Sequence, residues 1–100
     1  MEYETAQKLK KAILSVIGKH LDLKAYKVFI FGSRVEGKGS ERSDIDVGIE
    51  GEDPVPDLEM ALIHEAVENL PYLYTIEVVD FKKVSPDFYK VAKSHIERLN

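Results

Sequence analysis

The first apolar positions along the chain recur every three or four residues, which is the spacing of an amphipathic helix. This pattern runs from residue 5 to residue 21. Its apolar positions are Leu9, Ala12, Ile13, Val16, Ile17 and Leu21. The other positions are rich in lysine, so we expect that face of the helix to meet solvent.

Two strands separated by a polar segment are predicted next. Residues 26–31 form a β-branched and aromatic run that stops at Gly32, which is typical of a buried strand. Residues 44–50 alternate strictly, with Ile45, Val47 and Ile49 on one face and mainly acids on the other, which predicts a half-buried strand. Between them, residues 33–43 are polar and rich in glycine and charge. We expect this segment to be an ordered loop that contributes to function.

The second half of the chain predicts a helix, a strand and a last helix. Pro56 suits the first turn of a helix that continues to Leu70, and residues 74–81 read as a strand. Ser85 and Pro86 provide an N-cap and a first-turn proline for the last helix. Its expected buried stripe consists of Phe88, Val91, Ala92, Ile96 and Leu99. The order predicts one domain over residues 1–100, with an α/β (α+β) fold in which helices cover mainly one face of a mixed β-sheet.

Composition narrows the classes of function. The chain has 100 residues and no cysteine, which excludes disulfides and thiolate metal sites. A net charge of −4 disfavours long nucleic acids as partners. No apolar run approaches the roughly 20 residues that a membrane-spanning helix needs. The first residues do not resemble a secretory signal, so we expect a cytoplasmic location.

Asp44 and Asp46 are the first candidates for chemistry. They are two residues apart on a predicted strand, which places both side chains on one face, roughly 6–7 Å apart. Carboxylates so close repel each other, and a divalent cation such as magnesium would relieve that repulsion. For an isolated Asp-x-Asp, a solvated acidic face remains the commoner explanation.

Gly32 and Glu77 strengthen the case for a site. A glycine at the end of a buried strand, followed by Ser33, can turn sharply and offer backbone N–H groups and a hydroxyl to a triphosphate, although an ordinary turn has the same residues. Glu77 lies on the face of its strand opposite Ile76, Val78 and Asp80. If its strand neighbours that of Asp46, three carboxylates could hold two metal ions. The alternative for Glu77 is a solvent-facing side chain.

Together these motifs resemble the minimal nucleotidyltransferase family of the polymerase-beta superfamily. Phe31-Gly32-Ser33 is followed after ten residues by Asp44-Ile45-Asp46-Val47, with an acid on a later strand. Other matching features are the Arg34-Val35-Glu36-Gly37 continuation, Ser43 and the Ser-Pro-Asp-Phe sequence at residues 85–88. The resemblance spans almost the whole chain and implies a nucleotidyltransferase core. Glu77 departs from it, because family members often have aspartate there.

The resemblance also implies the roles of individual residues. Gly32 and Ser33 would hold the triphosphate of ATP, and Arg34 and Ser43 would complete the nucleotide-binding set. Two Mg²⁺ ions would be bound by three catalytic carboxylates, which are Asp44, Asp46 and Glu77. The three histidines, His20, His64 and His95, are interpreted as structural or solvated.

The family's function sets the biological expectation. Similar small proteins act as antitoxins that transfer AMP from ATP to a tyrosine of an all-helical HEPN toxin, so a nucleoside triphosphate and a HEPN protein are the expected partners. A homo-oligomer is also compatible with the sequence. The alternative hypothesis is a module without catalysis that binds a nucleotide or masks a surface of its partner.

Overall fold

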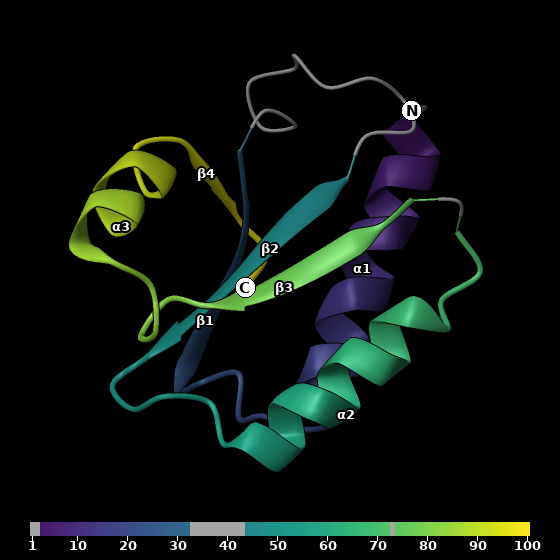
Figure 1. Cartoon of the computed structure of the whole chain (residues 1–100). Helices are drawn as coiled ribbons and strands as arrows, with labels where there is room; N and C mark the ends of the chain where they lie inside the picture. The colour runs from purple at the N-terminus through teal and green to yellow at the C-terminus, as the bar shows by residue number, and fades with distance from the viewer. Residues whose placement is uncertain (1–2, 33–43, 73) are drawn as a thin grey trace.

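A computed structural model describes residues 3–32, 44–72 and 74–100 of the chain (Figure 1). Within them lie three helices and four strands, which are α1 Tyr3–Gly18, β1 Tyr26–Phe31, β2 Ile45–Gly51, α2 Asp57–Glu68, β3 Ile76–Asp80, α3 Pro86–Ala92 and β4 Ile96–Arg98. Ser33, Arg34 and Ser43, three residues expected to bind nucleotide, lie outside the described residues. No helix of the described part is long and apolar enough to cross a bilayer.

The four strands form one mixed sheet in the order β3-β2-β1-β4. β1 pairs antiparallel with both β2 and β4, whereas β2 and β3 are parallel neighbours joined through α2. This arrangement confirms the mixed α+β fold expected from the order of the elements. It also satisfies the condition that the sequence left open, because the strands of Asp46 and Glu77 are adjacent.

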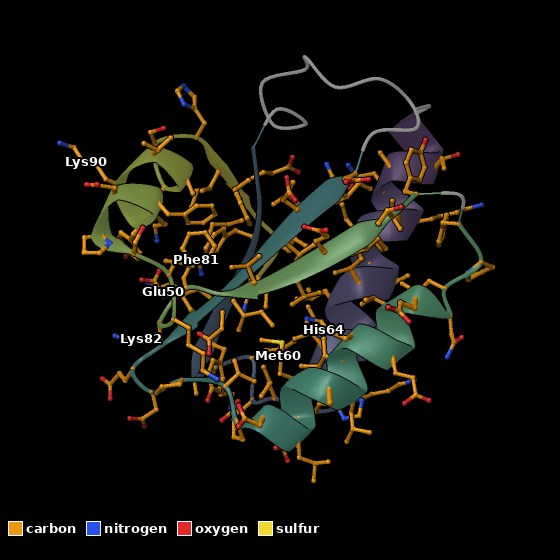
Figure 2. All side chains as sticks on the ribbon, viewed as in Figure 1. Glu50, Met60, His64, Phe81, Lys82 and Lys90 are labelled. Atoms are coloured by element: carbon orange, nitrogen blue, oxygen red, sulfur yellow. The ribbon has the colours of Figure 1, made fainter. Side chains whose placement is uncertain are left out.

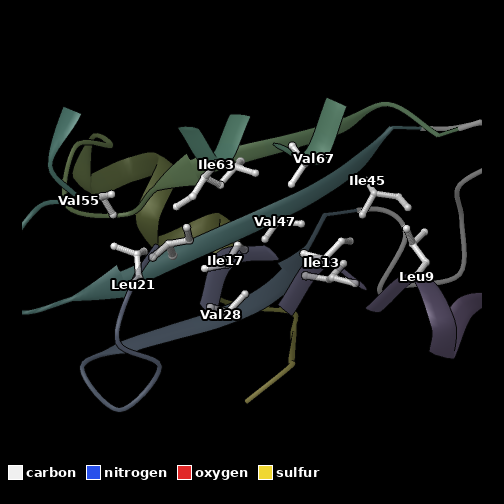
Figure 3. Close-up of a cluster of buried hydrophobic side chains, with 13 residues drawn as sticks. Leu9, Ile13, Ile17, Leu21, Val28, Ile45, Val47, Val55, Ile63 and Val67 are labelled. Carbon is white, nitrogen blue, oxygen red and sulfur yellow. The ribbon is translucent and has the colours of Figure 1, made fainter. Parts of the chain in front are cut away.

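The larger hydrophobic core lies between the sheet and the helices α1 and α2 (Figure 3). The predicted inward residues of β2, which are Ile45, Val47 and Ile49, are at most 1% exposed. The helices contribute Leu9, Ile13, Ile17, Ile63 and Val67 to this core. Because side chains alternate along a strand, the acids of β2 must emerge on the opposite face of the sheet.

That opposite face is covered in part by α3 and a cluster of phenylalanines. Phe29, Phe31 and Phe81 are buried, with the rings of Phe29 and Phe81 only 4.8 Å apart between centroids. Gly48 lies opposite Phe29 in the β1/β2 register, and a Cβ at this glycine would stand 2.4 Å from the Phe29 ring. The rings therefore occupy the space that any side chain at position 48 would need.

The prediction for the last helix was wrong at its end. α3 stops at Ala92, and Ile96 pairs with Phe31 in β4 instead of continuing a helical stripe. Phe88 and Val91 are 42% and 74% exposed, whereas Tyr89 and Ala92 face the phenylalanine cluster. The apolar residues predicted to form one helical stripe are therefore divided between α3, the strand β4 and the residues after it.

Candidate active site

Two carboxylates, those of Asp46 and Glu77, sit beside each other on the α3 face of the sheet. Asp46 and Glu77 are direct partners in the parallel β2/β3 register. Asp46 is part-buried and Glu77 is exposed. Both point away from the core formed with α1 and α2, because their neighbours Ile45, Val47 and Val78 are buried there. The predicted acid pair is therefore assembled by strand pairing.

The electrostatics of this group confirm its crowding. The pKa of the Asp46 carboxyl is raised above its ordinary value, first by burial, then by the negative charges of Glu77 and Asp44. Asp44, immediately before β2, is exposed to solvent. Glu77 and Asp44 thus lie close enough for their charges to act on the Asp46 carboxyl.

Gly32 brings the end of β1 against the same acid. Its φ is +88°, a conformation that side-chain-bearing residues rarely adopt. A Cβ at Gly32 would lie 3.0 Å from the Asp46 Oδ2 atom. The glycine therefore serves two needs at once, because it permits the turn after β1 and leaves room for the Asp46 carboxylate.

The donor set suits magnesium with substrate as co-ligand. Among the described residues, no three His, Asp or Glu side chains are grouped closely enough to hold an ion jointly. Mg²⁺ is commonly bound by one or two carboxylates, with phosphate oxygens and water completing its octahedron. Hard carboxylate oxygens under mutual repulsion, as at Asp46, fit that mode of binding.

A cavity of about 320 Å³ opens next to Gly32, between the end of β1 and α3. Its lining consists of Phe31, Gly32, Phe88, Val91, Ala92, Ser94 and His95. The cavity was not expected from the sequence, since it depends on the exposed placement of Phe88 and Val91. Gly32 thus borders the cavity, and the space where its Cβ would lie is next to the Asp46 carboxylate.

Sequence reasoning also missed the network that fastens α3 to the sheet. The Lys93 Nζ atom donates to Glu50 Oε1 at 2.6 Å, and the Tyr89 hydroxyl donates to Glu50 Oε2. Figure 2 shows Glu50 and Phe81 on the α3 side of the sheet. Burial acts to raise the pKa of Glu50, but the hydrogen bonds from Lys93 and Tyr89 outweigh it and hold that pKa below its ordinary value. The spacing of Tyr89 and Lys93, one helical turn apart, was the available signal.

One histidine has a structural contact, as expected from the sequence. The His64 Nε2 atom lies 3.0 Å from the backbone oxygen of Val78 on β3. Asp80, on the core side of β3 as predicted, is buried and accepts hydrogen bonds from the backbone N–H groups of Val55 and Lys82. It therefore supports the connection between β2 and α2 and takes no part in the acid group.

Comparison with known proteins places these features in context. Residues 6–98 match the family described as Polymerase beta, Nucleotidyltransferase. A Haemophilus influenzae protein named as a probable protein adenylyltransferase, MntA, is 32% identical over 68 residues. The match covers 68% of this chain and 60% of that relative, so the chain aligns with less than two thirds of its length.

Solved structures share the fold at low sequence identity. A toxin-antitoxin crystal structure with AMP-PNP superposes with a TM-score of 0.75 at 16% identity, over 91% of this chain and 72% of that one. A complex of tri-AMPylated Shewanella oneidensis HEPN toxin with MNT antitoxin gives a TM-score of 0.69, also at 16% identity, over 94% and 71% of the two chains.

Proposed function

Because the chain belongs to the polymerase beta nucleotidyltransferase family, we propose that it transfers AMP from ATP to an acceptor hydroxyl with the help of magnesium. The observation that carries this proposal is the placement of Gly32 against Asp46 Oδ2, with Glu77 paired to Asp46 on the next strand. A tight glycine turn beside adjacent carboxylates provides room for phosphates and ligands for their counter-ions in one place.

In this proposal, separate residues of the chain bind the metal and the nucleotide. Asp44 and Asp46 would hold magnesium, and the ion would supply neutralisation of the phosphate charge during transfer. Gly32 lets the triphosphate approach the backbone closely, and Ser33, Arg34 and Ser43 extend the nucleotide site. Phosphoryl chemistry asks mainly for such positioning and charge neutralisation.

Glu77 completes the reaction at the acceptor. The acceptor oxygen forms a bond to the α-phosphorus while the bond from that phosphorus to the bridging oxygen of pyrophosphate breaks. The hydroxyl proton passes to a carboxylate oxygen of Glu77, which is exposed and adjacent to Asp46. Glu77 would also be a carboxylate ligand for magnesium, since it is paired with Asp46 on the neighbouring strand.

We infer that the acceptor is a tyrosine of an all-helical HEPN partner. Two findings support this choice: the protein adenylyltransferase name of the relative, and the complex of an AMPylated HEPN toxin with an MNT antitoxin that has this fold. In that role the chain would act as an antitoxin that modifies its partner.

The test combines the protein, labelled ATP, magnesium and a HEPN partner. We expect pyrophosphate release and a mass increase of the partner. The change Asp44→Ala with Asp46→Ala should lower the rate about a thousandfold, the equivalent of roughly 4 kcal/mol. Asp53→Asn, an exposed acid in the turn after β2, is the matched control.

Two variants of Glu77 separate catalysis from binding. Glu77→Asp should keep measurable transfer, whereas Glu77→Gln, nearly isosteric but uncharged, should lose most of it. Nucleotide binding without pyrophosphate release, for the parent protein and with every partner supplied, would contradict the proposal. It would favour a non-catalytic module that binds nucleotide or masks its partner.

A further inference from the structure

A second cavity, of about 500 Å³, opens at the end of the sheet away from the acid group. Asp46 pairs with Phe31 at the end of β1, whereas Glu50, which lines this cavity, pairs with Lys27 near the start of β1. The other walls come from the turn before β1, the turns after β2 and β3, and the segment at residues 98–100. Figure 2 shows Glu50 and Lys82 at this end of the sheet. The cavity is therefore separate from the site proposed for transfer.

Cationic side chains are concentrated in the lining of this cavity, although the chain as a whole has a net charge of −4. They are Lys24, Lys27, Lys82 and Arg98. Within the described part of the chain none of the four forms a salt bridge, whereas Lys10, Lys83 and Lys93 are each paired with a carboxylate. Cations gathered in a concave surface raise the local concentration of anions. We call this feature the basic cavity.

Two carboxylates also line the basic cavity, and they differ in their contacts. Both oxygens of Glu50 are engaged, since Oε1 accepts from Lys93 Nζ at 2.6 Å and Oε2 accepts from the Tyr89 hydroxyl. Glu52 is exposed in the turn after β2 and forms no salt bridge within the described residues. The positive charge of the lining therefore exceeds its negative charge, and Glu52 is the acid that would oppose an anionic ligand.

Hydrogen bonds hold the wall that carries Lys24 in place. Asn100 Nδ2 donates to the backbone oxygens of Leu23 at 3.0 Å and of Tyr26 at 2.8 Å. The backbone N–H of Lys24 donates to Asp22 Oδ1 at 2.9 Å. The backbone of this wall is thus ordered before any ligand arrives, which lowers the entropic cost of binding.

From this arrangement we propose that the basic cavity binds a compact anion of the phosphate class that carries two or more negative charges. A tetrahedral phosphate group presents oxygens in several directions, so cations that converge from separate segments can contact one group together. A carboxylate has two oxygens in one plane and suits fewer cations. Leu23 and Ala25 in the lining leave an apolar surface for a small organic part of the ligand. The inference goes beyond the proposed transfer reaction and does not depend on it.

The first experiment titrates inorganic pyrophosphate into the protein by calorimetry, in buffer freed of metal ions with a chelating resin. At an ionic strength of about 0.15 M, the Debye length is about 8 Å, so diffuse attraction to distant charges is screened. Without metal, the carboxylates around Asp46 repel pyrophosphate. We expect saturable binding with one site per chain, and weaker binding of citrate, which carries its charge on carboxylates.

Paired variants locate the site. Lys24→Gln with Lys82→Gln should weaken pyrophosphate binding about tenfold or more, because two charged donors are lost. Lys8→Gln with Lys11→Gln is the matched control, since it removes the same charge from exposed positions on α1 and should leave binding unchanged. All four side chains except that of the partners they would offer a ligand are free of salt bridges, so the variants should keep the parental fold.

A change in the opposite direction gives an independent test. Glu52→Gln removes the opposing carboxylate and should tighten pyrophosphate binding, whereas Glu65→Gln, the same change at an exposed position of α2, should not. A gain in affinity cannot result from a damaged fold.

Three results would overturn the inference. One is the absence of saturable pyrophosphate binding without metal, including binding that appears only with magnesium and is lost in Asp46→Ala. Another is an equal loss of affinity in the α1 control, which would mean that only net charge matters. The third is citrate binding at least as tight as that of pyrophosphate. Metal-free pyrophosphate binding by a protein that fails to transfer AMP would support this inference while contradicting the proposed function.

Discussion

The charge of Asp46 should lower the free energy of unfolding of the protein when no metal is bound. Its carboxylate is part-buried and directly opposite Glu77, and its pKa is raised by burial, Glu77 and Asp44 in that order. A raised folded-state pKa means that the charged form is disfavoured in the folded protein. The change Asp46→Asn removes this charge at nearly constant shape, so we expect it to stabilise the protein in EDTA.

The size of the stability gain from Asp46→Asn can be estimated from the pairing of Asp46 with Glu77. Cross-strand side-chain pairs are worth on the order of 0.2–1 kcal/mol, and like charges act against folding. With the added cost of partial burial, the gain from Asp46→Asn should be about 1 kcal/mol. For a domain of this size that corresponds to a rise in Tm of roughly 4–8 °C. Asp53→Asn, the same chemical change at an exposed turn, should stay within about 0.5 kcal/mol of the parent.

The pH dependence has a defined sign. Below the unfolded pKa of Asp46, whose ordinary value is 3.8, the group is protonated in both states and costs nothing. The destabilisation grows as pH rises through the interval between the unfolded and the raised folded pKa, and it is complete above that interval. The difference in Tm between Asp46→Asn and the parent should therefore be full at pH 7 and vanish near pH 3.

Thermal unfolding followed by circular dichroism measures these differences. Magnesium with tripolyphosphate should raise the Tm of the parent, because the ligands bind only the folded state, and should do much less for Asp46→Asn. If the variant unfolds at or below the parental Tm in EDTA at pH 7, the carboxylates do not repel each other as inferred, and the reasoning for a metal site on this face fails.

Three further changes test the face that carries α3. Gly48→Ala should cost about 1–3 kcal/mol in urea unfolding, because its Cβ would clash with two aromatic rings. Lys93→Met should cost about 1–3 kcal/mol at pH 7 by leaving Glu50 without its ion pair. Because the Glu50 pKa is lowered by that pair, the stabilisation is present above its ordinary value of 4.5 and is lost as pH falls through the lowered value, so the Tm difference should shrink at low pH. Ser85→Ala should cost about 1 kcal/mol, measured by urea unfolding, since the Ser85 hydroxyl caps α3.

The spacing of apolar residues along the sequence was enough to predict much of the fold. The alternation of β2 placed Ile45, Val47 and Ile49 in the core, and the β-branched and aromatic run at residues 26–31 predicted β1. These elements are predictable because their side-chain pattern is set by local geometry. The end of α3 is not, since Ile96 satisfies either a helical stripe or a strand. β1 has a second edge that needs hydrogen bonds, and this non-local demand draws Ile96 into β4.

The residues of the candidate site also divide into those predictable from a local sequence pattern and those that depend on contacts between distant parts of the chain. The shared face of Asp46 and Glu77 was predictable because side chains alternate along a strand, whereas the adjacency of β2 and β3 followed only from the structure. Asp44 was predicted on the same strand but lies just before β2. The role of Glu50 depends on the docking of Tyr89 and Lys93 from a helix some forty residues later, which no local pattern contains. The metal and nucleotide roles of the acids and of Ser33, Arg34 and Ser43 stay predictions.

Because α3 is attached through Glu50, β2 fixes the distance between the acids at one end of the strand and α3 at the other. Asp46 and Glu50 are four residues apart on one strand and one face, a separation of roughly 13 Å at the rise of a β-strand. One end of this length holds the acids, and the other holds the helix that walls the cavity. Deleting a single residue between them would shorten the length and turn one end to the opposite face, so β2 should tolerate substitutions on its surface far better than any change in its length.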